Sequence, residues 1–153
     1  VTYERREEFA ELARENVARS KLKNVKVKVG DVFSSITEKN LDLVTLDLAD
    51  SDRVLPSAYN ALKVGGFVAG YLPHAEQVSK FVKESERVGF VGIFTIECIV
   101  REMLVRESGF RPENTGLTHT AYLVFARKGE MKAQVVQESA DRRFDGQNQA
   151  GSA

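Results

Sequence analysis

The sequence is poor in cysteine, proline and tryptophan, and it carries no excess of charge of either sign. Of its 153 residues one is cysteine, three are proline and none is tryptophan, and 22 basic side chains balance 22 acidic ones. A single cysteine, Cys98, can form no internal disulfide bridge and cannot build a cysteine-based metal cluster. The balanced charge removes the usual electrostatic argument for a nucleic-acid partner. These absences favour a cytoplasmic protein without a metal centre.

Long hydrophobic runs are also lacking. No apolar stretch approaches the ~20 residues that cross a bilayer, and the charged residues 1–6 do not form a signal peptide, so the sequence predicts neither a membrane protein nor a secreted one. A chain of this length with 42% hydrophobic residues can bury a core without disulfides or metals. The sequence begins with Val1 instead of methionine and enters in the middle of a predicted element, and we therefore expect a fragment.

Hydrophobic periodicity divides the chain into helices and strands. Apolar residues at helical spacing predict three helices, and alternating or continuous apolar runs predict five strands. Cys98 falls in a predicted strand and is interpreted as a core residue. The pair Gly65-Gly66 is interpreted as the end of the second helix. The predicted helices span residues 5–20, 51–62 and 74–88, the predicted strands span residues 25–29, 41–48, 67–72, 90–105 and 118–127, and residues 108–117 are predicted to form a loop.

The order of these elements predicts the class of fold. Strands alternate with helices and then two strands follow each other, which is typical of an open, doubly wound α/β sheet with an antiparallel pair at its end. Residues 1–129 form the predicted domain. Residues 130–153 contain too few large apolar side chains to build a core, and we expect them to be a disordered tail.

Four polar residues fall where a predicted strand ends or would end. They are Glu4, Asp31, Asp47 and Tyr71. Ligands of such sheets bind beyond the carboxyl ends of the strands, so these residues are candidates for one site. The alternative is structural, because Asp and Glu frequently cap helices in such loops and a tyrosine can be a core residue.

Several longer motifs carry a resemblance. Residues 3–6 (Tyr-Glu-Arg-Arg), 29–32 (Val-Gly-Asp-Val), 41–48 and 61–67 resemble successive motifs of class I S-adenosylmethionine methyltransferases. The later segments, residues 97–102, Arg111-Pro112 and residues 116–128, are similar to those of the tRNA (adenine-58, N1) methyltransferases of the TrmI type. The resemblance covers residues 1 to about 128.

The resemblance implies a Rossmann-like sheet, mostly parallel with a terminal antiparallel pair, and an incomplete one. Members of the family have an N-terminal β-rich domain and a first, central strand with a glycine-rich loop before the Tyr-Glu motif, and this chain contains neither. The missing strand belongs between the strand that ends at Glu4 and the strand that ends at Asp47. We therefore expect the sheet to split at that gap, with residues 25–29 beside the stub ending at Glu4 and residues 41–48 left with one unpaired edge.

The resemblance also implies roles for the residues at the strand ends. Glu4 would accept hydrogen bonds from the ribose hydroxyls of S-adenosylmethionine, and Asp31 would accept one from its exocyclic amine, with the amide of Val32 facing the adenine ring. Asp47, next to the cofactor, would accept from N6 of the target adenine and so orient its N1. Tyr71 would stack on the extruded base. Weaker candidates for substrate binding are Gln77, Arg111 as a phosphate-binding loop cation, and His119, which packing or a hydrogen bond also explains.

The implied function is methyl transfer from S-adenosylmethionine to N1 of adenine 58 in tRNA. The implied partners are tRNA and further copies of the chain, in a homotetramer assembled through the late strands. We expect the 153-residue chain alone to be inactive, because the cofactor's methionine half has no glycine-rich loop here. Two alternatives remain from other classes: a noncatalytic RNA-binding or scaffolding subunit of a tRNA methyltransferase complex, and a nucleotide-dependent oxidoreductase.

Overall fold

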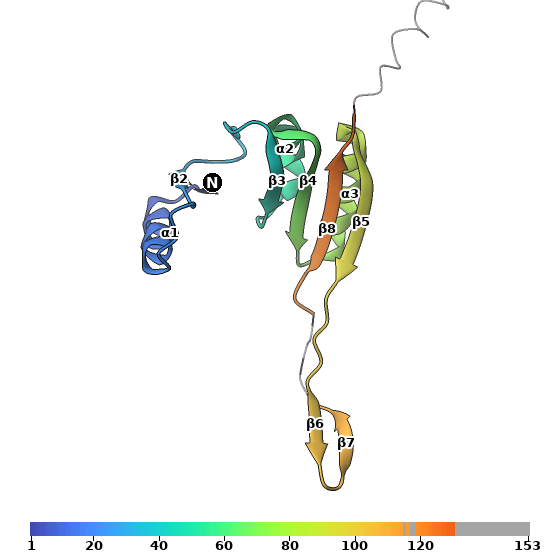
Figure 1. Ribbon diagram of the computed structural model, residues 1–153. Helices are drawn as coiled ribbons and strands as arrows, with labels where there is room; N and C mark the ends of the chain where they lie inside the picture. Colours follow the sequence, from blue (N-terminus) through green and yellow to red (C-terminus); the bar gives the residue numbers. More distant parts are fainter. Residues whose placement is uncertain (115, 117–118, 131–153) are drawn as a thin grey trace, which may run out of the picture.

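The computed structural model describes residues 1–114, 116 and 119–130, which form an α/β sheet structure with an extended hairpin (Figure 1). In chain order the elements are β1 (Thr2–Glu4), α1 (Glu7–Arg19), β2 (Val27–Val29), β3 (Leu41–Leu46), the 3₁₀ turn η1 (Ser51–Val54), α2 (Leu55–Ala61), β4 (Leu62–Leu72), α3 (Ala75–Val88), β5 (Phe90–Glu97), β6 (Met103–Arg106), β7 (Gly109–Pro112) and β8 (Tyr122–Lys128).

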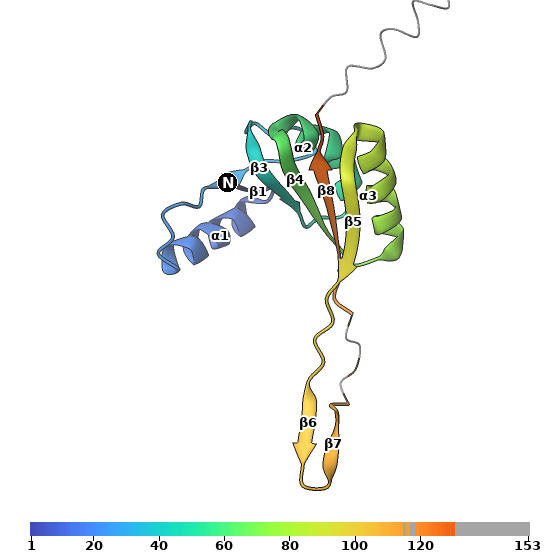
Figure 2. The same ribbon diagram turned by 45° about the vertical axis from the view of Figure 1, so that its right-hand side comes forward.

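The main sheet has the strand order β3-β4-β8-β5. β3 and β4 are parallel, whereas β8 runs antiparallel to both of its neighbours, β4 and β5. Helices α2 and α3 cover one face of this sheet (Figure 2), and the buried cluster between the two layers includes Leu46, Leu55, Val68, Phe81 and Val124. The predicted α/β sheet with a terminal antiparallel pair is confirmed.

A second, two-stranded sheet contains the start of the chain. β1 and β2 are parallel, with Glu4 opposite Val29, and they form no ladder with the main sheet. Within the described part of the chain, β3 pairs with β4 alone and its other edge has no partner strand. In Figure 1 the unit of β1, α1 and β2 lies to one side of β3. The predicted split of the sheet is therefore confirmed.

The late strands differ from the sequence prediction. Residues 90–105 do not form one strand: β5 ends at Glu97, and β6 begins only at Met103. The predicted loop 108–117 is also wrong in part, because β7 pairs antiparallel with β6 across the two-residue connection 107–108. Tight hairpins need only such a short connection, and Pro112 is tolerated because it lies at the end of a two-stranded ribbon. Cys98, predicted to be buried, follows β5 and is exposed.

The glycine pair has a different position from the predicted one. α2 ends at Ala61, and residues 62–66 already belong to β4. The register between β3 and β4 shifts here, since Leu41 pairs with Leu62 but Leu43 pairs with Phe67. A Cβ atom on Gly66 would lie 2.8 Å from the carbonyl oxygen of Leu41, and Gly65 has a φ of +83°. Glycine is required because the chain bulges at close approach to β3, not because a helix ends.

The other boundaries agree with the prediction to within a few residues, with two exceptions. β8 begins at Tyr122 instead of residue 118, and the predicted helix 51–62 consists of the 3₁₀ turn η1 followed by α2. Of the predicted tail, residues 131–153 lie outside the described residues. No helix in the described part of the chain is long and apolar enough to cross a membrane.

Candidate functional site

Glu4 and Asp31 lie at the same end of the small sheet. The amide of Gly30 donates a hydrogen bond of 3.0 Å to the carbonyl oxygen of Glu4, which fixes the residue before Asp31 next to the end of β1. Oε1 of Glu4 accepts a bond of 2.9 Å from the amide of Arg6, and Oδ1 of Asp31 accepts one of 2.9 Å from the amide of Phe33. Both carboxylates are thus held by backbone amides in short turns. Asp31 therefore has the structural role of a turn residue, and the same hydrogen bond to the amide of Phe33 orients its side chain.

The local hydrogen bonds favour the charged form of Glu4. The amide of Arg6, followed by its guanidinium group, lowers the pKa of Glu4 below its ordinary value against the opposing effect of desolvation. The Arg6 side chain lies within 3.4 Å of Glu4 Oε1. Glu4 is therefore a carboxylate at neutral pH and acts as a hydrogen-bond acceptor only.

A buttress of four side chains supports this end of the small sheet from one side. The ammonium group of Lys28 on β2 forms an ion pair with Glu38, and Thr37 Oγ1 lies 3.0 Å from Lys28 Nζ. Tyr3 on β1 donates through its hydroxyl to Glu38 Oε2 at 2.5 Å. The Lys28 ammonium, and after it the Tyr3 hydroxyl, lower the pKa of Glu38 to about 2. This group ties both strands of the small sheet to the segment that leads into β3.

Asp47 and Tyr71 lie at the same end of the main sheet. Leu46 pairs with Gly70 in the parallel register of β3 and β4, so the next residue of each strand reaches the same edge. Asp47 is exposed, and the side chain of Tyr71 is exposed too, with 42% of the residue accessible. This accessibility argues against the alternative of a buried core tyrosine. The register therefore brings an exposed carboxylate residue and an exposed tyrosine to the same edge of the sheet.

Gln77 lies in the first turn of α3 and has a structural partner. Its Oε1 accepts a hydrogen bond of 3.2 Å from the amide of His74, the N-cap of the helix. This contact satisfies an amide that a helix leaves unpaired at its start. Val32 follows Asp31 and packs its side chain against the core of the main sheet. The predicted substrate and cofactor roles of these two residues stay predictions.

Arg111 was predicted in a loop and lies instead on β7 of the hairpin, which projects from the main sheet (Figure 1). Its guanidinium group donates to the carbonyl oxygen of Pro112 and to Oδ1 of Asn114, each at 3.2 Å. The structure does not place Arg111 with Asp47 and Tyr71 on the sheet edge. Its predicted contact with a phosphate group stays a prediction.

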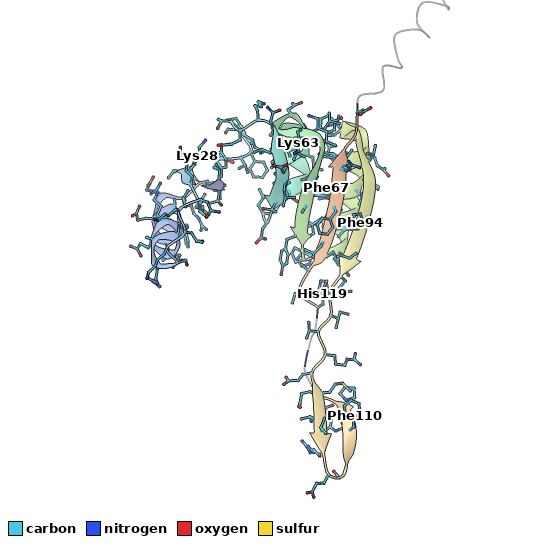
Figure 3. All side chains as sticks on the ribbon, in the orientation of Figure 1. Lys28, Lys63, Phe67, Phe94, Phe110 and His119 are labelled. Carbon is cyan, nitrogen blue, oxygen red and sulfur yellow. The ribbon has the colours of Figure 1, made fainter. Side chains whose placement is uncertain are left out.

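His119 lies at the junction of the main sheet and the hairpin (Figure 3). Its Nδ1 is 2.5 Å from Glu97 Oε1 at the end of β5, and its Nε2 is 3.0 Å from the carbonyl oxygen of Pro73. The hydrogen bond to Glu97, and after it the one to Pro73, raise the pKa of His119 above its ordinary value. Sequence reasoning assigned no role to Glu97, because nothing in a linear sequence shows that the two residues meet.

The candidate site thus consists of two pairs, Glu4 with Asp31 and Asp47 with Tyr71, one on each sheet. Sequence reasoning missed the buttress around Glu38 as well as Glu97. Alternation of Lys26 and Lys28 with valines indicated only that the two lysine side chains lie on one face of the predicted strand 25–29. Among the described residues, no group of three or more His, Cys, Asp or Glu side chains is arranged to hold a metal ion.

Known proteins resemble this chain over most of its described length. The profile of the family described as "tRNA methyltransferase complex GCD14 subunit" matches residues 1–118. The tRNA (adenine(57)-N(1)/adenine(58)-N(1))-methyltransferase TrmI of Methanocaldococcus jannaschii is 36% identical over 154 residues, covering 83% of this chain and 55% of the relative.

Two solved structures are similar in fold and sequence. A SAM-dependent O-methyltransferase from Thermotoga maritima has a TM-score of 0.80 at 33% identity, covering 86% of this chain and 50% of that protein. The tRNA (m1A58) methyltransferase TrmI from Aquifex aeolicus has a TM-score of 0.74 at 32% identity, covering 83% and 52%. The chain spans about half the length of each of these relatives. The likeness confirms the class I methyltransferase fold.

Proposed function

Because this chain belongs to the family of the tRNA methyltransferase complex GCD14 subunit, we propose that it takes part in methyl transfer from S-adenosylmethionine to N1 of adenine 58 in tRNA. The proposal places it in the cytoplasm, with tRNA as its partner. The observation that carries it is the register of β3 and β4, which brings Asp47 and Tyr71 to one edge of the sheet.

The residues at the end of the small sheet fit S-adenosylmethionine. Glu4 accepts through Oε1 from the amide of Arg6, and Asp31 accepts through Oδ1 from the amide of Phe33. A charged carboxylate accepts well from a ribose diol or from an exocyclic amine. Bound S-adenosylmethionine supplies the methyl group. Glu4 would hold its ribose and Asp31 its adenine amine, with the amide of Val32 facing the ring.

The residues at the edge of the main sheet fit the target base. N1 of adenine has a lone pair and needs no base to become a nucleophile, but its methylation leaves a positive charge on the ring and its amine. Asp47 would accept from N6, which orients N1 and stabilises the developing charge. Tyr71, exposed at the same edge as Asp47, offers a ring on which an extruded adenine can stack.

The test compares two alanine variants in the natural full-length protein. We expect Asp47→Ala to lower the methylation rate ~10²-fold or more, because a fixed electrostatic partner of the reacting base is lost, with little change in cofactor affinity. We expect Glu4→Ala to weaken cofactor binding instead. Rates come from transfer of labelled methyl groups to tRNA, and affinities come from calorimetry.

Asp52→Ala is the matched control, since Asp52 lies in η1 close to Asp47 in sequence and should change neither quantity. An equal loss of cofactor affinity in Asp47→Ala and Glu4→Ala would contradict the assignment of Asp47. A wild-type protein that binds tRNA but transfers no methyl group would instead support the noncatalytic subunit.

We also propose that the protein is a homotetramer assembled through its late strands. Large apolar side chains are exposed there, with 77% of Val105 and 68% of Phe110 accessible on the hairpin. Exposed apolar surface of this kind is typical of protein interfaces. Assembly would also gather Arg101, Arg106 and Arg111 from several copies, which offers a chain of zero net charge a basic surface for RNA.

A further inference from the structure

His119 connects three segments that are far apart in the sequence. It precedes β8, and its ring reaches Glu97 at the end of β5 and the carbonyl oxygen of Pro73 in the turn between β4 and α3. The ring of Tyr122, the first residue of β8, lies 4.7 Å from the imidazole between centroids. Figure 3 shows His119 at the end of the main sheet from which the hairpin projects.

The two partners of the imidazole fix its protonation state. A backbone carbonyl oxygen only accepts hydrogen bonds, and so does an ionised carboxylate, whereas a neutral imidazole has one N–H. Both ring nitrogens of His119 can donate at the same time only when the ring is an imidazolium. The hydrogen bonds to Glu97 and Pro73 therefore belong to the charged form.

The groups around the ring agree with a positive charge. Glu97 from β5 is the charged group in contact with it, the ring of Tyr122 from β8 packs against it in a tilted arrangement, and the turn after β4 presents the carbonyl of Pro73. Together the hydrogen bonds raise the pKa of His119, with the bond to Glu97 as the largest cause. Below that pKa the ring holds all three segments, and above it one of the two hydrogen bonds is lost.

The contact with Pro73 acts on the edge that carries Tyr71. Only Leu72 separates the two residues, and Tyr71 and Leu72 pair with Leu123 and Tyr122 of β8. The imidazolium thus attaches the turn that ends β4 to the start of β8 and to the end of β5, while α3 begins immediately after this turn. Loss of the contact frees the turn without removing any residue from the core.

We propose that His119, as an imidazolium paired with Glu97, is a positioning residue that holds the turn after β4 and thereby sets the place of Tyr71 for the target base. In this role it acts through the turn, and the substrate contact implied by the resemblance stays a prediction. The effect on methylation rests on the proposed function, but the clamp of Glu97, His119 and Pro73 does not.

The clamp is tested in this chain by imidazole ¹⁵N NMR. The sequence has two histidines, so a His74→Asn variant, which keeps a good N-cap residue, assigns the signals. At pH 6 we expect both nitrogens of His119 to carry a proton and the ring to titrate above pH ~6.5, the value of an unperturbed histidine. In Glu97→Gln the titration should move to lower pH. A His119 with one N–H at pH 6, or a midpoint that Glu97→Gln leaves unchanged, would overturn the clamp.

The positioning role is tested by kinetics in the natural full-length protein. We expect His119→Ala to lower kcat for methylation about tenfold, since displaced reacting groups lose rate steeply. The KM for S-adenosylmethionine should stay within about twofold, because Glu4 and Asp31 lie on the other sheet. His119→Gln, which keeps a donor without a titrating charge, should recover part of the rate.

The pH profile separates this role from a merely structural one. The wild-type rate should fall as pH rises through the pKa of His119, the fall should disappear in His119→Gln, and it should move to lower pH in Glu97→Gln. Identical profiles in all three proteins, or an unchanged kcat in His119→Ala, would overturn the positioning role. Absence of methylation in the wild type would overturn the proposed function, while the NMR titration would still decide the clamp.

Discussion

Phe81 can fill the centre of the core because Gly70 leaves space for its ring. Phe81 is fully buried, and a Cβ atom on Gly70 would lie 2.9 Å from its Cε2 atom. Neither ring nor strand can move easily, since Gly70 pairs with Leu46 on one side and Val124 on the other. We expect Gly70→Ala to lower the free energy of unfolding by about 1–3 kcal/mol, measured by urea denaturation.

A double variant isolates the clash with Phe81. Phe81→Leu removes the atoms that a new Cβ would meet, so Gly70→Ala should cost less in a Phe81→Leu background than in the wild type. An equal loss in both backgrounds would show that the cost lies elsewhere in β4, for example in its backbone pairing.

At the scale of the elements, Lys128 closes the C-terminal end of α2. Its ammonium group donates to the carbonyl oxygens of Tyr59 at 2.7 Å and Leu62 at 2.8 Å. The last carbonyls of a helix lack partners within it, so the lysine satisfies that of Tyr59 and joins β8 to the end of α2 and to the start of β4. We expect Lys128→Met, which keeps the apolar stem, to destabilise the chain by about 1–2 kcal/mol in urea denaturation.

Lys63→Met is the matched control for this substitution. Lys63 forms an ion pair with Asp42, but both side chains are largely exposed, and such surface pairs contribute little. We expect a change below about 0.5 kcal/mol. A loss in Lys63→Met as large as in Lys128→Met would contradict the capping role of Lys128.

The elements that the sequence predicted best are those with a strong local pattern. The apolar stripes of α1 and α3 and the run in β3 depend on spacing within one segment. The bulge at Gly65-Gly66 and the pairing of β6 with β7 depend on a second strand, which spacing does not reveal. The same limit applies to the site: Glu4, Asp31, Asp47 and Tyr71 follow from strand ends and the resemblance, whereas the contact of Glu97 with His119 spans 22 residues.

At the scale of the whole molecule, the buttress around Glu38 joins the small sheet to the segment before β3. The pKa of Glu38 in the folded chain is about 2, below the value of about 4.3 for an unperturbed glutamate. Because its pKa is lower in the folded chain, the Glu38 carboxylate contributes its full stabilisation at pH values above the pKa of the unfolded chain. This contribution is lost as the pH falls from that value towards 2. We expect carboxyl ¹³C NMR to show the low midpoint, and Lys28→Met to raise it.

Lys26→Met is the control for that titration. Lys26 lies just before β2, and its backbone carbonyl bonds to the amide of Thr2. Its removal changes the net charge by the same amount as Lys28→Met but should leave the midpoint of Glu38 close to 2. If both variants raise the midpoint equally, the general charge of the small sheet, not the ion pair with Lys28, lowers the pKa.

Two surfaces of the molecule are candidate interfaces for self-association. The proposed assembly uses the hairpin, where Val105 is exposed. The alternative surface is the edge of β3 that has no partner strand in the described part of the chain, and Leu43 of β3 is 52% accessible. We expect Val105→Lys to reduce the molecular mass measured by light scattering, and Leu43→Lys to leave it unchanged. The opposite result would assign association to the open edge of β3 and contradict assembly through the late strands.

The position of β8 in the sheet has a consequence for how the chain is made. β8 is the last strand of the described chain, yet it lies between β4 and β5 and supplies Val124 and Ala126 to the core. During translation α3 and β5 therefore leave the ribosome before β8 has been synthesised. Until β8 is available, β4 and β5 cannot be joined in one sheet. Contacts of such long sequence separation form slowly, and apolar surface stays accessible in the meantime. Folding of this chain is expected to be completed only after synthesis has passed Lys128, so early termination before Tyr122 would leave two unpaired halves instead of a smaller domain.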